Sequence, residues 1–352
     1  MSRLLEVAGA RTYAGAGVSI EAGDDVVQRF KSSVESTIRP GVLGGIGGFG
    51  GLFALDTKKY QEPVLVASAD GVGTKLEVAR LVGRYDTVGV DLVAMLVDDL
   101  VCVGAEPLFM LDYVAVGSVN PEQLEVLVSG IANGCRQAGV ALLGGETAEH
   151  GGVMKPDDLD VAGFALGVVE SAEILSAQRV RAGDALVGLH SPGLRSNGYA
   201  LAREVLVTSG ASLQQPAFKD AARNLADELL VPSVIYAPCV TALRHELGAA
   251  LHAVAHVTGG GIVGNVVRIL RDDLNAVIDM GSFPTPEIFF EIQRRGPVSA
   301  DEMVRVFNCG LGMVIAVDPR GAEDAVAVAR SLGVAASLVG EVRAGTREVL
   351  LT

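Results

Sequence analysis

Cysteine is scarce in this sequence, which has four cysteines in 352 residues and no CxxC pair. A zinc site is therefore not expected, because structural zinc sites need closely spaced ligands. Three of the four cysteines lie in apolar or glycine-rich stretches, which indicates that they are small buried residues. Free buried cysteines are typical of proteins in a reducing compartment. This pattern predicts a cytoplasmic protein with free thiols at Cys102, Cys135, Cys239 and Cys309.

Long apolar runs are also missing. The longest, residues 88–103, is interrupted by Asp91, Asp98 and Asp99, whereas a membrane-spanning helix needs about 20 apolar residues in succession. The first 17 residues contain no apolar core of the length found in signal peptides. We expect no membrane partner.

Basic residues are too few to form a nucleic-acid surface. The chain has 28 Lys and Arg against 42 Asp and Glu, and its net charge is −14. Binding a phosphate backbone requires a basic stripe, and none is visible in the sequence. We therefore expect no nucleic-acid partner. Phosphorylated ligands would have to be held by magnesium or by backbone N–H groups.

The length of the chain predicts two domains. Helical periodicity is seen over residues 19–38, 86–103, 122–138 and 323–332, and strand-like runs cover 63–68, 107–116, 140–143, 159–169, 185–189 and 311–317. The alternation of these elements predicts a mixed α/β (α+β) fold. Because the pattern restarts near residue 170, the expected domains are 1–169 and 170–352.

Glycine is plentiful, and one segment concentrates it. Residues 44–51 read GGIGGFGG, with six glycines in eight positions. Without Cβ atoms, backbone N–H groups of such a segment can approach a phosphate closely. Neither the Walker A pattern nor the Rossmann GxGxxG arrangement is present. A flexible surface loop remains the alternative interpretation.

Acidic residues recur at places suited to a metal. Asp70 follows a predicted strand in the sequence SADGVGTK, with Lys75 near by; an ordinary turn with Thr74 as helix N-cap is the alternative. Asp91, Asp98 and Asp99 lie in a strongly apolar helix, where acids must be paired, metal-bound or exposed. Glu146 follows a short strand and is expected in a tight turn.

The second half contains three glycine-rich turns with polar side chains. They are residues 191–199 (SPGLRSNGY), 256–261 (HVTGGG) and 307–313 (FNCGLGM). Turns of this kind ahead of helices can bind anions. Each pattern is weak by itself.

Taken in order, these motifs resemble the aminoimidazole ribonucleotide synthetases, also called phosphoribosylformylglycinamidine cyclo-ligases. The resemblance runs from about residue 13 to residue 342 and includes GAEPLF at 104–109, SGIANGC at 129–135 and GGETAE at 144–149. It implies ATP-dependent closure of formylglycinamidine ribonucleotide to aminoimidazole ribonucleotide through an iminophosphate. It also implies a two-domain synthetase fold, in which the N-terminal domains of a homodimer close a β-barrel beside an α/β sandwich-like C-terminal domain.

The resemblance also implies roles for individual residues. Metal binding and catalysis fall to Asp70, Asp99 and Glu146, with Lys75 as a further catalytic residue; the metal is Mg²⁺. ATP would contact Lys31, Gly44, Gly45, Gly47, Gly48, Phe49 and Gly50. The ribonucleotide substrate would contact Arg195, Ser196, Asn197, Gly198, Thr258, Gly259, Gly260 and Gly261.

Two departures from the family pattern leave alternatives open. Arg195 stands where histidine is usual, and Ala69 stands where threonine or serine is common. A catalytically silent nucleotide-binding homologue is one alternative. The other is a sister enzyme of the same superfamily, such as selenophosphate synthetase, thiamine monophosphate kinase or the preceding synthetase of the pathway.

Overall fold

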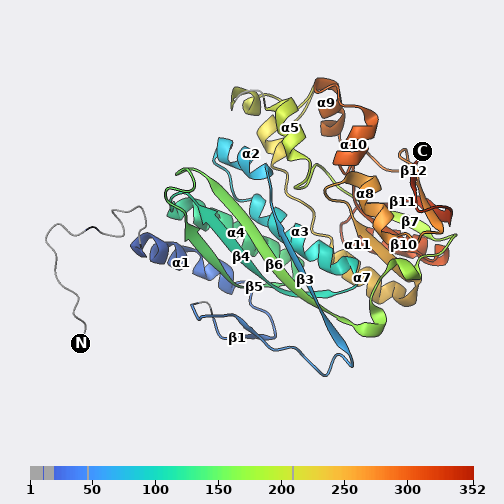
Figure 1. Ribbon diagram of the computed structural model, residues 1–352, viewed down its shortest axis with the longest axis horizontal. Coiled ribbons are helices and arrows are strands. Elements are labelled where there is room, and N and C mark those ends of the chain that lie inside the picture. The colour runs from blue at the N-terminus through green and yellow to red at the C-terminus, as the bar shows by residue number, and fades with distance from the viewer. Residues whose placement is uncertain (1–10, 12–19, 46, 208–209) are drawn as a thin grey trace.

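The computed structural model describes residues 11, 20–45, 47–207 and 210–352 (Figure 1). Its strands form a small hairpin and two larger sheets. The strands are β1 Val42–Leu43, β2 Leu52–Phe53, β3 Pro63–Gly71, β4 Glu106–Val116, β5 Ala141–Glu149, β6 Leu159–Glu170, β7 Ala185–His190, β8 Leu251–His256, β9 Leu274–Ile278, β10 Leu311–Val317, β11 Ala336–Ala344 and β12 Val349–Leu351.

The α-helices cover the faces of these sheets and pack between them (Figure 1). They are α1 Ile20–Glu35, α2 Lys75–Val82, α3 Val88–Cys102, α4 Pro121–Ala138, α5 Tyr199–Leu206, α6 Leu225–Leu229, α7 Ala237–Leu247, α8 Gly261–Val266, α9 Glu287–Arg295, α10 Ala300–Val306 and α11 Ala322–Ser331.

The four-stranded sheet is built from the first half of the chain, in the order β3-β6-β4-β5. β4 and β5 are parallel and are joined by the crossover helix α4, as parallel neighbours require. α3 and α4 cover one face of this sheet. On the other face Leu65, Tyr113 and Phe164 are exposed, so this sheet presents apolar side chains to the surface.

The six-stranded sheet is built from the second half, in the order β12-β9-β11-β7-β10-β8. Every residue of β8 and β10 is buried, as expected for strands with both faces covered. α3 lies between the two sheets and contacts α7 and β8 as well as β3 and β6 (Figure 1). The end of α3 is therefore the place where groups from both halves meet.

Most expected elements are confirmed within a few residues, and the strand at 311–317 is confirmed in full. The tight turn expected at Glu146 is wrong. β5 continues through the glycines to Glu149, because its parallel pairing with β4 extends as far as Val116 opposite Glu149. β3 likewise continues beyond Ser68 to Gly71, paired with β6. Ladder hydrogen bonds outweighed the low strand preference of glycine at both places.

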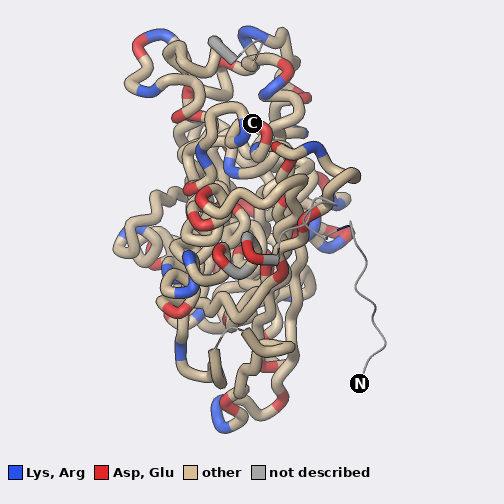
Figure 2. The backbone as a smooth tube through the Cα atoms, turned by 90° about the vertical axis from the view of Figure 1, so that its left-hand side faces the viewer, with Lys and Arg blue, Asp and Glu red and all other residues tan. Residues whose placement is uncertain are grey.

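Charged residues of both signs are interspersed along the side of the molecule shown in Figure 2. Within the described part of the chain, no helix is long and apolar enough to cross a bilayer.

Candidate functional site

A cavity of about 870 Å³ lies along the edge strand β5. Its walls come from α1, from the loop between β1 and β2, from most of β5, and from a few residues of β4 and α4. One part of the wall is apolar, with Val26, Phe30 and Val128, while the other consists of glycines and Glu146. This volume is within the range of nucleotide and other small-molecule sites.

The glycine-rich segment is the tip of the β1–β2 hairpin. The hairpin pairs Leu43 with Leu52, and the described residues between them, 44–45 and 47–51, form its loop. Gly44 and Gly47 have φ of 83° and 105°, which other residues rarely adopt. The predicted ATP residues Gly45, Gly47, Gly48, Phe49 and Gly50 line the large cavity.

The other two predicted ATP contacts lie outside this lining. Gly44 lines a smaller pocket that shares Gly45 and Gly51 with the large cavity. Lys31 is exposed on α1. Phe49 projects fully into solvent at the tip of the loop.

Asp112 is an acid in the cavity wall that the sequence analysis did not select. Its carboxyl group lies over Gly145 of the neighbouring strand, where a Cβ would approach Asp112 Oδ1 to 1.6 Å. Burial raises the pKa of Asp112 to about 7. A side chain at position 145 would therefore displace this carboxyl group.

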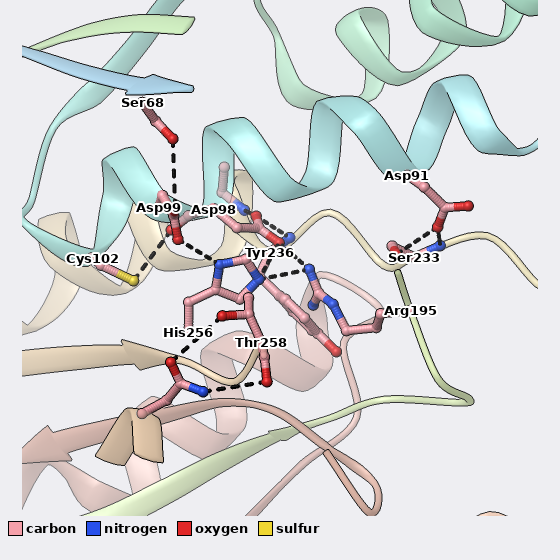
Figure 3. A network of polar contacts seen from close by, with 12 residues as sticks. Ser68, Asp91, Asp98, Asp99, Cys102, Arg195, Ser233, Tyr236, His256 and Thr258 are labelled. Carbon is pink, nitrogen blue, oxygen red and sulfur yellow. Dashed lines mark hydrogen bonds and ion pairs between the residues drawn. The ribbon is translucent and has the colours of Figure 1, made fainter. Parts of the chain in front are cut away.

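Asp70 and Asp99 form a second acidic site at the opposite edge of the sheet. Desolvation raises the pKa of Asp70, and the negative charge of Asp99 raises it further. Asp99 is about half exposed; its Oδ2 atom lies 3.5 Å from Ser68 Oγ and its Oδ1 atom lies 2.8 Å from His256 Nδ1 (Figure 3). Each carboxylate keeps oxygen available for a cation.

The other two acids of α3 are paired inside the protein. Lys75 Nζ lies 2.6 Å from Asp91 Oδ2, and neither side chain is exposed. Arg195 Nη2 donates to Asp98 Oδ2 over 2.8 Å (Figure 3). Of the three alternatives for acids in this helix, pairing holds for Asp91 and Asp98, and exposure for Asp99.

Lys75 and Arg195 are accordingly found away from solvent. Lys75 Nζ also donates to the carbonyl oxygens of Arg195 and Val231. The Arg195 guanidinium stacks over the ring of Tyr236, 4.7 Å from its centroid. Their predicted roles in catalysis and substrate contact remain predictions, and both side chains join the two halves of the chain.

The two predicted substrate turns lie side by side. A Cβ on Gly259 would come within 4.0 Å of Asn197 Nδ2. Asn265 Nδ2 donates to the carbonyls of Thr258, Gly259 and Gly261 and so holds the second turn. In the first turn Ser196 Oγ and Asn197 Oδ1 are buried and have no hydrogen-bond partner among the described residues. Such atoms are costly unless a ligand or water meets them.

The predicted magnesium ligands are not all together in one chain. Asp70 and Asp99 are neighbours, but Glu146 lies on β5, at the opposite edge of the sheet from β3. Three strand spacings separate these edges, or roughly 14 Å. Among the described residues no group of three or more His, Cys, Asp or Glu side chains is placed to hold one metal ion. The oxygen donors of Asp70 and Asp99 nevertheless suit Mg²⁺.

Sequence reasoning passed over three residues that shape these sites. His256 opens the motif HVTGGG and also ends the buried strand β8, and a histidine at the end of such an apolar run is a recognisable signal. Asp112 interrupts the apolar run FMLDYVAV, which is the same signal of a costly acid that drew attention to α3. Tyr236, whose N–H binds Asp98, gave no sign in the sequence.

Comparisons with known proteins agree over most of the chain. Residues 55–169 match the family model "AIR synthase related protein, N-terminal domain", and residues 181–351 match the corresponding C-terminal domain. The phosphoribosylformylglycinamidine cyclo-ligase of Carboxydothermus hydrogenoformans is 48% identical over 97% of this chain and 98% of its own length. The enzyme of the same name from Anaeromyxobacter dehalogenans strain 2CP-1 is 51% identical over 95% and 96%.

A solved structure shows the same fold at lower identity. Thiamine-monophosphate kinase from Stenotrophomonas maltophilia superimposes with a TM-score of 0.68 at 20% identity, covering 93% of this chain and 95% of that one. The expected mixed α/β, two-domain synthetase fold is thereby confirmed.

Proposed function

We propose a mechanism for this chain from the premise that it belongs to the phosphoribosylformylglycinamidine cyclo-ligase family. It is an ATP-dependent ligase of purine biosynthesis that closes the imidazole ring of aminoimidazole ribonucleotide. The observation that carries the mechanism is the arrangement of two half-sites, a glycine-lined cavity and an acidic cluster, on opposite edges of one sheet.

ATP binds in the cavity along β5. The glycines at 45, 47, 48 and 50 bring backbone N–H groups to the phosphates, and the apolar wall with Val26, Phe30 and Val128 covers the base. Gly44 and Lys31 complete the phosphate contacts. Phe49, exposed at the loop tip, covers the bound nucleotide.

The acidic residues hold Mg²⁺ and order the reacting groups. The ion neutralises charge on the transferred phosphate when it is bound. Asp70 and Asp99 supply two carboxylates from β3 and α3, and Glu146 supplies a third from β5. Desolvation and the charge of Asp99 both raise the pKa of Asp70, and a cation held by the two carboxylates would offset both effects.

The substrate lies against the turns at 195–198 and 258–261. The unpaired Ser196 Oγ and Asn197 Oδ1 support this assignment, because a polar ligand satisfies them. The formyl amide oxygen attacks the γ-phosphorus and ADP leaves. The amidine nitrogen then attacks the formyl carbon. The bond between this carbon and its phosphorylated oxygen breaks, phosphate leaves, and the attacking nitrogen loses its proton. Positioning supplies most of the rate enhancement.

A homodimer joins the two half-sites. The exposed apolar face with Leu65, Tyr113 and Phe164 is a surface that a second copy can cover. If two such sheets close a barrel around a two-fold axis along the barrel, β5 of one protomer comes beside β3 of the other. Glu146 of one chain then serves the same site as Asp70 and Asp99 of the other.

The four free thiols support a cytoplasmic setting.

The direct test mixes the protein with formylglycinamidine ribonucleotide, ATP and magnesium. We expect aminoimidazole ribonucleotide, followed by its diazo colour, and ADP in equal amounts. Asp99→Ala should abolish both products while leaving the melting temperature close to that of the wild type. ATP binding with neither product would instead identify a silent homologue.

A further inference from the structure

The proton on His256 has a position determined by its two neighbours (Figure 3). Arg195 Nη2 lies 2.9 Å from His256 Nε2. A guanidinium has only donors, so Nε2 must present its lone pair. The ring proton of the neutral imidazole is therefore on Nδ1, from which it is donated to Asp99 Oδ1 over 2.8 Å.

Arg195 is itself held by a buried carboxylate. The same Nη2 donates to Asp98 Oδ2, and the side chain is only 1% exposed. Asp98 Oδ1 in turn accepts from the backbone N–H groups of Tyr236 and Ala237 at the start of α7. Arg195 adopts a φ of 64°, an uncommon conformation for a residue other than glycine. The surrounding contacts stabilise this conformation.

Asp99, by contrast, has a half-exposed side chain on the surface of α3. Among the residues that the structure describes, its other side-chain hydrogen bond is the long one from Ser68 Oγ to Oδ2. Without His256 the carboxylate would be free to rotate. With His256 one oxygen is fixed, and Oδ2 remains available for a ligand.

We propose that His256 is a positioning residue that holds Asp99 in its cation-binding orientation, and that Arg195 acts through His256 by fixing its tautomer. The second half of the chain thereby aligns a carboxylate of the first half. Partners behind a metal ligand commonly change metal affinity 10- to 100-fold when they are removed. This inference rests on the proposed function, in which Asp99 holds the metal.

His256→Asn and His256→Ala separate alignment from simple packing. The asparagine amide can occupy the place of Nδ1–H and donate to Asp99, whereas alanine cannot. We expect Mn²⁺ affinity, measured by electron paramagnetic resonance with a non-hydrolysable ATP analogue, to fall roughly tenfold or more in His256→Ala and to be largely retained in His256→Asn.

His252→Ala is the matched control. His252 lies on the same strand, is buried, and contacts Asp184 Oδ2 through Nδ1 at 2.7 Å. It should lower the melting temperature and leave the Mn²⁺ affinity unchanged. Equal loss of Mn²⁺ affinity in His252→Ala and His256→Ala would overturn the inference, because both would then act through stability alone.

Nitrogen-15 NMR spectra of the histidine rings test the role of Arg195 and do not require an activity assay. In the wild type the His256 signals should show the Nδ1–H tautomer, and in Arg195→Met the two tautomers should mix. If the tautomer of His256 is unchanged in Arg195→Met, the claim that Arg195 fixes this tautomer is overturned. If Asp99→Ala itself leaves Mn²⁺ affinity unchanged, the proposed metal site fails and the inference fails with it. If Asp99→Ala weakens binding but His256→Ala does not, only the inference fails.

Discussion

Lys75 Nζ lies 2.6 Å from Asp91 Oδ2 in a fully buried ion pair that links α2 to α3. Asp91 Oδ1 also accepts two hydrogen bonds from Ser233, one from N–H and one from the hydroxyl. Since Ser233 belongs to the second half of the chain, this pair fastens the two halves together. Because neither side chain is exposed to solvent, the contribution of this pair to the free energy of unfolding can be measured separately from catalysis.

Lys75→Met should lower the free energy of unfolding by about 3–5 kcal/mol, because it leaves the Asp91 carboxylate buried without its cation. Lys75→Met combined with Asp91→Asn should be less destabilised, since asparagine still accepts from Ser233. Urea unfolding measures both. Arg271→Gln, which breaks the exposed pair with Asp273, is the control and should cost less than about 1 kcal/mol. A loss that small in Lys75→Met would contradict the prediction.

The same variants address the predicted catalytic role of Lys75. If the side chain acts only in packing, the double variant should retain its kcat per folded molecule. A double variant that folds but turns over far more slowly would instead support a catalytic role.

The sequence could reveal that α3 carries costly acids, but it could not say how they are satisfied. The apolar pattern over residues 86–103 and the interruptions at Asp91, Asp98 and Asp99 are local features. Their partners are not: Arg195 lies 97 residues beyond Asp98. Pairing across such distances depends on strand order and domain packing, which hydrophobic periodicity does not determine.

The separation of the two half-sites also could not be predicted from the sequence, because it too depends on strand order. In the sequence, Glu146 and Asp70 each come after a short apolar run, so their local patterns look alike. Only the order β3-β6-β4-β5 shows that they lie on opposite edges. The glycines before Glu146 favour a turn in the sequence, but β5 continues through them because they pair with β4, and Gly145 leaves room for the Asp112 side chain.

Gly89 is predicted to be essential for the packing of α3 on α4. A Cβ at this position would lie 2.3 Å from Ile131 N, which is backbone and cannot move aside cheaply. Gly89→Ala should therefore destabilise the fold by about 1–3 kcal/mol or more. Gly264→Ala, in α8 with no atom near its Cβ position, should be neutral or stabilising by up to about 1 kcal/mol. Equal effects of the two changes on the melting temperature would refute this explanation.

Asp112 should make stability depend on pH. Its folded-state pKa of about 7 lies above the unfolded value, so the folded state binds more protons between the two. Its contribution to stability is greatest at low pH and declines as pH rises towards 7, by up to about 1.4 kcal/mol per unit. Urea unfolding from pH 5 to pH 8 should show this decline for the wild type relative to Asp112→Asn. Parallel curves for the two proteins would exclude the raised pKa.

Heterodimers can decide whether one active site uses two chains. Asp99→Ala and Glu146→Ala chains, co-expressed with different affinity tags, should each be inactive as homodimers. If Glu146 serves the Asp99 of the partner, the purified heterodimer contains one intact site and should show about half of the wild-type activity. If each site lies within one chain, this heterodimer has no intact site and stays inactive.

The reciprocal heterodimer supplies the control. Here one chain carries both substitutions and the other carries neither. A shared site predicts that both sites are defective and activity is lost, whereas a site within one chain predicts that about half remains. Because the two heterodimers contain the same number of substitutions, a general loss of stability would affect both alike. Only a site that spans the two protomers yields an active first heterodimer and an inactive second one.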